Sequence, residues 1–210
     1  MYSGKSVFLT TVHLPQTDPK KITFYLYVRR ARALTKEGNF TDALYDLHFA
    51  KRFDPQNARI ELYLSRIYQK LDQGDAALDS VNDALVLKPR YADALAHRTT
   101  LYLATGAPDK AVKDYEAAID STSYRQDRFH LKIGQIRMAG KAFDDAVTQF
   151  RKAHEINTKN SAAWKAETKA LLILKRKIEA TNALRQYVLL NPDDKDIKTL
   201  EKQIDQIPDQ

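Results

Sequence analysis

One pattern of alanines recurs along this 210-residue chain and limits what the chain can fold into. The pattern consists of paired alanines seven residues apart, and successive pairs are separated by 34, 34 and 35 residues: Ala43/Ala50, Ala77/Ala84, Ala111/Ala118 and Ala146/Ala153. A fifth repeat continues at Ala180, with Tyr187 in the second position. A period of this length indicates an array of small units, each of which buries its apolar face against its neighbours.

A turn signal and a stop signal accompany the alanines. Glycine marks the middle of three repeats at Gly38, Gly106 and Gly140, whereas Gly74 comes two residues late and Lys175 replaces it in the fifth. Proline or a substitute closes each repeat: Pro55, Pro89, Ser123, Thr158 and Pro192. Glycine permits the left-handed backbone that ends a helix, and proline disfavours helix in the residue before it. Each repeat is therefore predicted to be two helices joined by a tight turn.

Apolar residues within a repeat follow helical spacing. The first half of the second repeat has one apolar stripe, made of Ile60, Leu64, Ile67, Tyr68 and Leu71. These steps fit a period of about 3.6 residues. The alanines lie two turns apart on the second helix, where a leucine would overpack the contact at a cost of about 1–3 kcal/mol. Pro108 is expected in the first turn of a second helix, and Thr41 is the predicted N-cap of another.

Period, glycine, paired alanines and closing proline together resemble the tetratricopeptide repeat family. The resemblance covers five units: 24–57, 58–91, 92–125, 127–160 and 161–194. It departs from the family pattern in two ways, since the early aromatic is clear only as Tyr27 and Trp164, and the fourth unit starts one residue late. The resemblance implies an all-α, right-handed α-solenoid of five helix-turn-helix repeats.

The two ends of the chain lie outside the repeats. Residues 195–210 contain an apolar stripe (Ile197, Leu200, Ile204 and Ile207) with charged residues between, which predicts a C-terminal capping helix and tail. Residues 1–23 do not match the repeat and are predicted to be an N-terminal arm, extended or flexible. Because the arm contains Val7, Phe8, Leu9, Val12 and Leu14, it could pack on the first helix pair or in a groove; a mobile terminus is the alternative.

The resemblance implies that the first helix of each unit lines a concave groove that holds a peptide. The expected groove residues are Tyr25, Arg32, Lys36, Arg59, Leu62, Tyr63, Arg66, Lys70, Leu103, Leu131 and Met138. Arg32 and Arg66 occupy the same position in adjacent units, as do Lys36 and Lys70. Such stacked like charges favour a bound carboxylate, or else form a solvated charged face. Leu103, Leu131 and Met138 would form an apolar floor or belong to the core.

The net charge of +7 and the pI of about 9.4 favour acidic partners. The predicted function is therefore non-catalytic protein–protein recognition of an acidic or acidic-apolar segment, with homo-oligomers possible through the N-terminal end. Nucleic-acid binding through the basic face is the alternative.

No catalytic, metal or cofactor site is predicted, because the chain has no cysteine, its histidines are scattered and it has no glycine-rich loop. No apolar run is long enough to span a membrane. A cytoplasmic location fits the N-terminus, and a periplasmic or membrane-peripheral one stays open if a signal was removed.

Overall fold

A computed structural model describes residues 19–208, which contain eleven α-helices and no strand. The helices are α1 (Pro19–Glu37), α2 (Phe40–Phe53), α3 (Ala58–Lys70), α4 (Gly74–Leu87), α5 (Ala92–Ala104), α6 (Pro108–Ser121), α7 (Gln126–Ala139), α8 (Phe143–Ile156), α9 (Ser161–Ile173), α10 (Lys177–Leu190) and α11 (Ile197–Asp205). The expected all-α solenoid with a C-terminal capping helix is confirmed. None of the described helices has the length and apolarity needed to cross a membrane.

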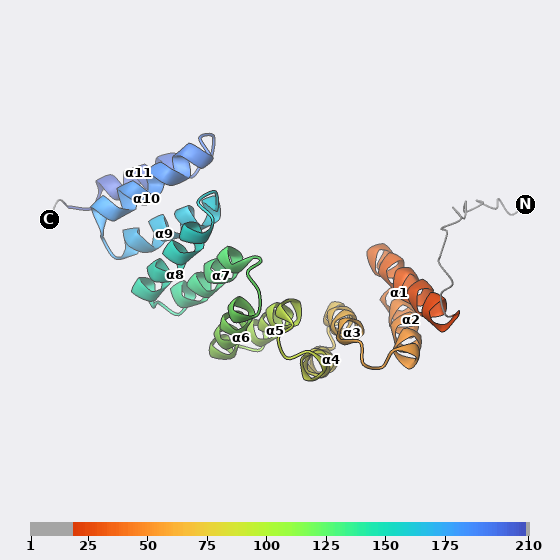
Figure 1. Cartoon of the computed structure of the whole chain (residues 1–210). Coiled ribbons are helices and arrows are strands. Elements are labelled where there is room, and N and C mark those ends of the chain that lie inside the picture. Colours follow the sequence, from red (N-terminus) through yellow and green to blue (C-terminus); the bar gives the residue numbers. More distant parts are fainter. Residues whose placement is uncertain (1–18, 209–210) are drawn as a thin grey trace, which may run out of the picture.

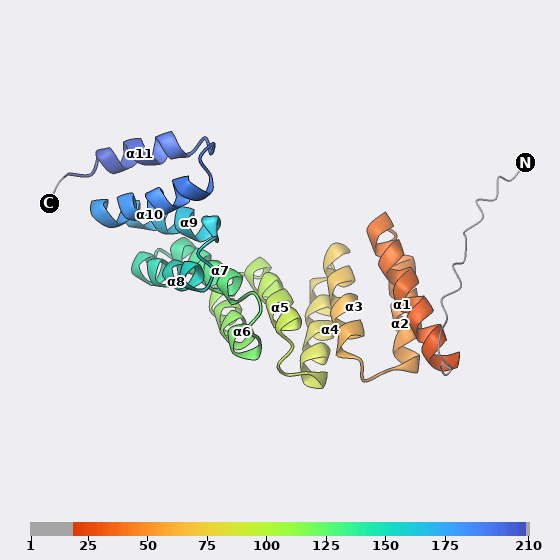
Figure 2. The same ribbon diagram turned by 45° about the horizontal axis from the view of Figure 1, so that its top comes forward.

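The helices pack as consecutive antiparallel pairs that follow one another along an open arc (Figure 1). The pair α1–α2 lies at one end of the arc and α9–α11 lie at the other, an arrangement that Figure 2 shows from a second direction. Because each pair touches mainly the pair before and the pair after it, the apolar core is a chain of three clusters along the arc.

The paired alanines form the contacts between helices. All eight of them have exposed fractions of 0%, and so does Ala180. Tyr187, which takes the alanine position in the fifth repeat, is also buried, and its hydroxyl donates a hydrogen bond to the Asp194 carboxylate. A small side chain at these positions permits close helix approach, which explains why the alanine spacing recurs.

The turn inside each pair has one residue with a left-handed backbone, always two residues before the second helix. These residues are Gly38, Asp72, Gly106, Lys141 and Lys175, with φ between 56° and 83°. The position is therefore regular even where the glycine is absent. The expectation for Gly140 was wrong by one residue, because Lys141 carries the positive φ, and Gly74 is instead the first residue of α4.

Helix starts differ from the sequence predictions in two places. The N-cap of α2 is Asn39 and not Thr41, since the Asn39 side-chain oxygen accepts a hydrogen bond from the Asp42 N–H at 3.3 Å. The first helix begins at Pro19, so residues 19–23 are helical and not part of an extended arm. Residues 1–18, and with them the prediction that the arm docks, lie outside the described residues. Pro108 begins α6, as expected.

The last helix closes the stack. Ile197, Leu200, Ile204 and Ile207 are buried, and the first three belong to the C-terminal core cluster. Lys165 of α9 reaches the loop before α11, with its ammonium 3.0 Å from the Asp194 carboxylate and 2.8 Å from that of Asp196. The cap is therefore held by an apolar stripe and by ion pairs to the preceding repeat.

Candidate functional site

Two adjoining depressions lie between the first helices of the first two repeats, α1 and α3, and together they form what is called here the α1–α3 groove. One has a volume of about 390 Å³ and the other about 310 Å³. The two share Arg32 and Tyr63, so they are continuous. Their walls are Phe24, Tyr25, Val28, Arg29, Arg32, Asn57, Arg59, Ile60 and Tyr63 in the first, and Ala31, Arg32, Thr35, Lys36, Leu47, Tyr63, Arg66 and Ile67 in the second.

The groove is basic. Its walls carry Arg29, Arg32, Lys36, Arg59 and Arg66, and no aspartate or glutamate is among the residues that line it. No ion pair joins any of these five side chains to a carboxylate within residues 19–208. Like charges held together in this way repel one another unless solvent or an anion screens them. An anionic group placed among these side chains would relieve this repulsion.

One basic side chain of the groove is already held in place. The Arg59 Nε–H donates a hydrogen bond to the Tyr63 hydroxyl at 2.8 Å, and the guanidinium lies 5.3 Å from the centre of the Tyr63 ring. This contact fixes Tyr63 between the two depressions. Tyr25 is 68% exposed and touches Phe24 edge-on, with ring centres 5.4 Å apart. The groove thus offers two tyrosine rings beside its charges.

The structure brings six of the eleven expected groove residues together here: Tyr25, Arg32, Lys36, Arg59, Tyr63 and Arg66. Lys70 is exposed at the end of α3, one turn beyond Arg66, and does not line either depression. The prediction for Leu62 was wrong, because its exposed fraction is 1% and it packs in a core cluster with Val81 and Leu95. Repeat position alone placed it in the groove, whereas α4 and α5 cover it in the fold.

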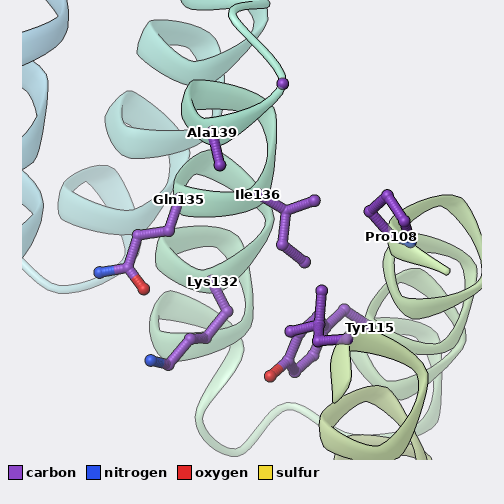
Figure 3. Close-up of a pocket in the computed structure, with 8 residues that line it drawn as sticks. Pro108, Tyr115, Lys132, Gln135, Ile136 and Ala139 are labelled. Carbon is purple, nitrogen blue, oxygen red and sulfur yellow. The ribbon is translucent and has the colours of Figure 1, made fainter. Parts of the chain in front are cut away.

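A separate depression of about 450 Å³ lies at the junction of α5, α6 and α7. It is lined by Leu103, Pro108, Tyr115, Lys132, Gln135, Ile136, Ala139 and Gly140. Figure 3 shows Ile136 of α7 pointing towards Tyr115 and Pro108 of α6. The one-residue insertion in the repeat period falls in α7, which has 14 residues where α3, α5 and α9 have 13 each.

The expected apolar floor is only partly found in this depression. Leu103 lies at its rim and is exposed. Leu131 and Met138 are half-buried and pack against the C-terminal core cluster, so the alternative reading of these two as core residues holds. The sequence analysis did not include two residues of this depression. Tyr115 lies in α6, the second helix of its repeat, and Ile136 lies in α7, the first helix of the next repeat. Their contribution depends on how two repeats meet, which no single-repeat pattern indicates.

The positive charge of Arg66 affects a histidine of the neighbouring repeat. His97 of α5 is buried, and its Nε2 lies 2.9 Å from the Ser65 hydroxyl, which donates to the Ala77 carbonyl at 2.6 Å. Burial, followed by the positive charge of Arg66, lowers the pKa of His97 to about 4. Because the Ser65 hydroxyl already donates to Ala77, the Nε2–H of the neutral imidazole donates a hydrogen bond to the Ser65 oxygen. Within the described residues, no group of three potential metal ligands occurs.

Comparison with known proteins supports the repeat architecture. No family model matches the sequence. A curated relative, anaphase-promoting complex subunit 7 of Arabidopsis thaliana, is 28% identical over 129 residues, which is 61% of this chain but only 23% of that protein. The chain thus corresponds to less than a quarter of the length of that relative.

Solved structures resemble the chain over most of its length. PilF of Pseudomonas aeruginosa has a TM-score of 0.74 at 16% identity, covering 89% of this chain and 85% of PilF. YrrB, described as a tetratricopeptide repeat protein with an unusual peptide-binding site, has a TM-score of 0.68 at 16% identity, covering 88% of this chain and 98% of YrrB. These similarities confirm the tetratricopeptide repeat fold.

Proposed function

We propose that this chain is a non-catalytic adaptor that binds another protein through an extended, carboxylate-bearing segment held in the α1–α3 groove. One observation carries the proposal: five basic side chains line the groove without an acidic one among them. In a fold with 27 acidic residues spread along the chain, such a local separation of charge is suited to an anionic ligand.

Each depression of the groove has its own pair of basic groups beside the shared Arg32. Arg29 and Arg59 line the first, and Lys36 and Arg66 line the second. An arginine can hold a carboxylate through two parallel hydrogen bonds, which makes it more selective for that group than a lysine. The proposed ligand therefore presents at least two carboxylates, one to each side of Tyr63.

The depression at α5–α7 would take an apolar side chain of the same ligand. Its walls are mainly carbon, from residues such as Leu103, Pro108 and Ile136. Concave sites of this kind bind by removing apolar surface from water, while polar groups fix the orientation of the ligand. The ligand is thus expected to be an acidic segment with an apolar anchor. YrrB, which shares this fold, is described as having an unusual peptide-binding site, and this supports a peptide as the ligand.

Nucleic acid is the second candidate ligand, because Tyr25 is exposed beside Arg29 and Arg32 and could stack on a base. The peptide proposal is favoured because the ring of Tyr63 is already covered by Arg59, so of the two tyrosines that line the groove only Tyr25 has a largely exposed ring.

Binding measurements with two probes test the proposal. The first probe is a fluorescent peptide of glutamates around a Leu-Phe pair, with a glutamine version as its control, and the second is single-stranded oligouridine. Arg32→Glu with Arg66→Glu is expected to weaken peptide binding at least about tenfold, which corresponds to about 1.4 kcal/mol. Helicity and melting should stay unchanged, since both side chains are exposed.

A matched control separates the groove from the overall charge. Lys198→Glu with Lys202→Glu changes the net charge by the same amount, from +7 to +3, on the exposed side of α11. This variant is expected to change affinity less than about twofold in 0.15 M salt, where distant charges are screened. Equal losses in both double variants would contradict a groove site, and preference for oligouridine would replace the peptide with nucleic acid.

A further inference from the structure

One side of α1 has no neighbouring helix in the described part of the chain. Leu26 and Ala33 lie two turns apart on this side, and Leu26 is 60% exposed. The residues 34 positions later, Ile60 and Ile67, are buried because α2 of the preceding repeat packs against them. The exposed side of α1 is therefore the surface that stacks on a preceding element in every later repeat.

Aromatic rings extend this surface onto α2. The ring of Phe49 lies 4.4 Å from that of Tyr27, 6.4 Å from that of Tyr45 and 5.4 Å from that of Phe53. Tyr45 is 65% exposed. The positions of Tyr45 and Phe49 are mostly polar in the later repeats, where they hold Asp79 and Asp83, Lys113 and Ala117, Thr148 and Lys152, and Asn182 and Gln186. The apolar surface is thus a feature of the first repeat.

We propose that residues 7–14 of the same chain cover this surface, called here the end face and made of Leu26, Tyr27, Ala33, Tyr45, Phe49 and Phe53. The segment reads VFLTTVHL, with five apolar residues and no lysine, arginine or acid. It lies outside the described residues and belongs to the stretch that leads directly into α1. Contact between the segment and the end face would remove apolar side chains of both from water.

The length of the connecting chain permits this contact. A helix rises about 1.5 Å per residue, which puts Leu26 about 10 Å and Ala33 about 21 Å from the start of α1 at Pro19. Residues 14 and 7 precede Pro19 by five and twelve positions, so an extended chain at about 3.3 Å per residue spans about 17 to 40 Å. Because the segment is tethered, its effective concentration at the end face would be on the order of millimolar.

Other occupants match the end face less well. Two copies joined by a twofold axis would enclose the exposed Arg52, whose guanidinium lies over the Phe49 ring of the end face, in the contact. A head-to-tail contact would set the end face against the outer side of α11, where Lys198, Glu201 and Lys202 are exposed. The α1–α3 groove is also a poor alternative site for the segment, since Asp18 is the only acid among residues 1–18.

A double-mutant cycle in the full chain tests the proposal. Phe8→Ala, Leu26→Ala and the double variant are compared with the wild type by thermal unfolding. Each single change is expected to lower the melting temperature by about 2–6 °C, and the double variant should melt within about 1 °C of the lower single variant, because each change removes the same contact. Leu189→Ala is the control, since Leu189 is 76% exposed on α10 and its loss should leave melting unchanged within about 1 °C.

Three outcomes would overturn the proposal. The first is that Leu26→Ala melts like the Leu189→Ala control, which would mean that nothing covers Leu26. The second is that the effects of Phe8→Ala and Leu26→Ala add independently, which would mean that the two residues do not touch. The third is that light scattering reveals a dimer that Leu26→Ala dissociates, which would assign the end face to a second copy. Peptide binding in the groove is measured separately and should not change with Phe8→Ala, so this proposal and the proposed function fail independently.

Discussion

The two ends of the solenoid differ in how their apolar stacking surfaces are covered. At the C-terminal end, α11 covers the last helix pair, and Leu200 in its apolar stripe is only 3% exposed. At the N-terminal end, no helix of the described residues covers Leu26 and Tyr45, which are 60% and 65% exposed. Both ends carry apolar residues at stacking positions. A separate helix covers the stacking surface at the C-terminal end, and we propose that residues 7–14 do so at the N-terminal end.

The largest expected effect is at the covered end. Leu200→Ala removes a buried side chain and should cost about 2–5 kcal/mol, with melting lowered by about 2–4 °C for each kcal/mol. Hydrogen exchange should show faster exchange in α10 and α11 before the rest of the chain. Leu189→Ala again serves as the exposed control. Uniform loss of protection along the whole chain would mean that α11 is not an independent cap.

Acid should weaken the two halves of the molecule in different pH ranges. The folded chain holds the pKa of His97 near 4, below its ordinary value of 6.5, so the unfolded chain binds the proton more readily. Its contribution to stability is complete above about pH 6.5 and is lost as pH falls towards 4. Stability measured from pH 7 to 4 should show this slope, and His97→Gln should flatten it.

The cap responds at lower pH. Hydrogen bonds from the Tyr187 hydroxyl, the Asp196 N–H and Lys165 lower the pKa of Asp194 from 3.8 to about 2. Its contribution is present above about pH 3.8 and is lost as pH falls towards 2. Protection factors should therefore fall first around α3–α5 and only later around α10–α11. Loss of the cap at pH 5 before any change near His97 would contradict this order.

The smallest effect is a change in one pKa. Burial and then the positive charge of Arg66 lower the pKa of His97, so Arg66→Gln should raise that pKa part of the way, as measured by an NMR titration of the imidazole. Lys70→Gln is the control, because Lys70 does not contribute to the shift. A carboxylate bound in the α1–α3 groove should likewise raise the pKa of His97. If the pKa of His97 is unchanged in the Arg66→Gln variant, the charge of Arg66 does not act on α5.

Much of the fold was predictable because it depends on local and periodic signals. The alanine spacing gave the five helix pairs, and the apolar stripe from Ile197 to Ile207 gave the cap. The turn residues were less predictable. Lys141 and Lys175 adopt a left-handed backbone that glycine would adopt more readily, because the packing of the two flanking helices fixes the turn.

The groove was predictable in its first two repeats and not beyond them. Arg32 and Arg66 occupy equivalent helix positions, and stacking places equivalent positions side by side, so the basic cluster follows from the period. Leu131 and Met138 followed the same rule and are nevertheless packed against the core. The depression at α5–α7 depends instead on Tyr115 and Ile136, which meet only at the junction of two repeats.

The sequence by itself determined where the helices lie and how closely they pack, because small side chains at a fixed period act within one repeat and its neighbour. Only the tertiary structure decided which apolar residues another helix covers. Leu62 and Leu26 are both leucines in the first helices of repeats, yet one is buried and the other exposed. Their burial depends on whether another helix lies against that side, and that is a property of the whole stack.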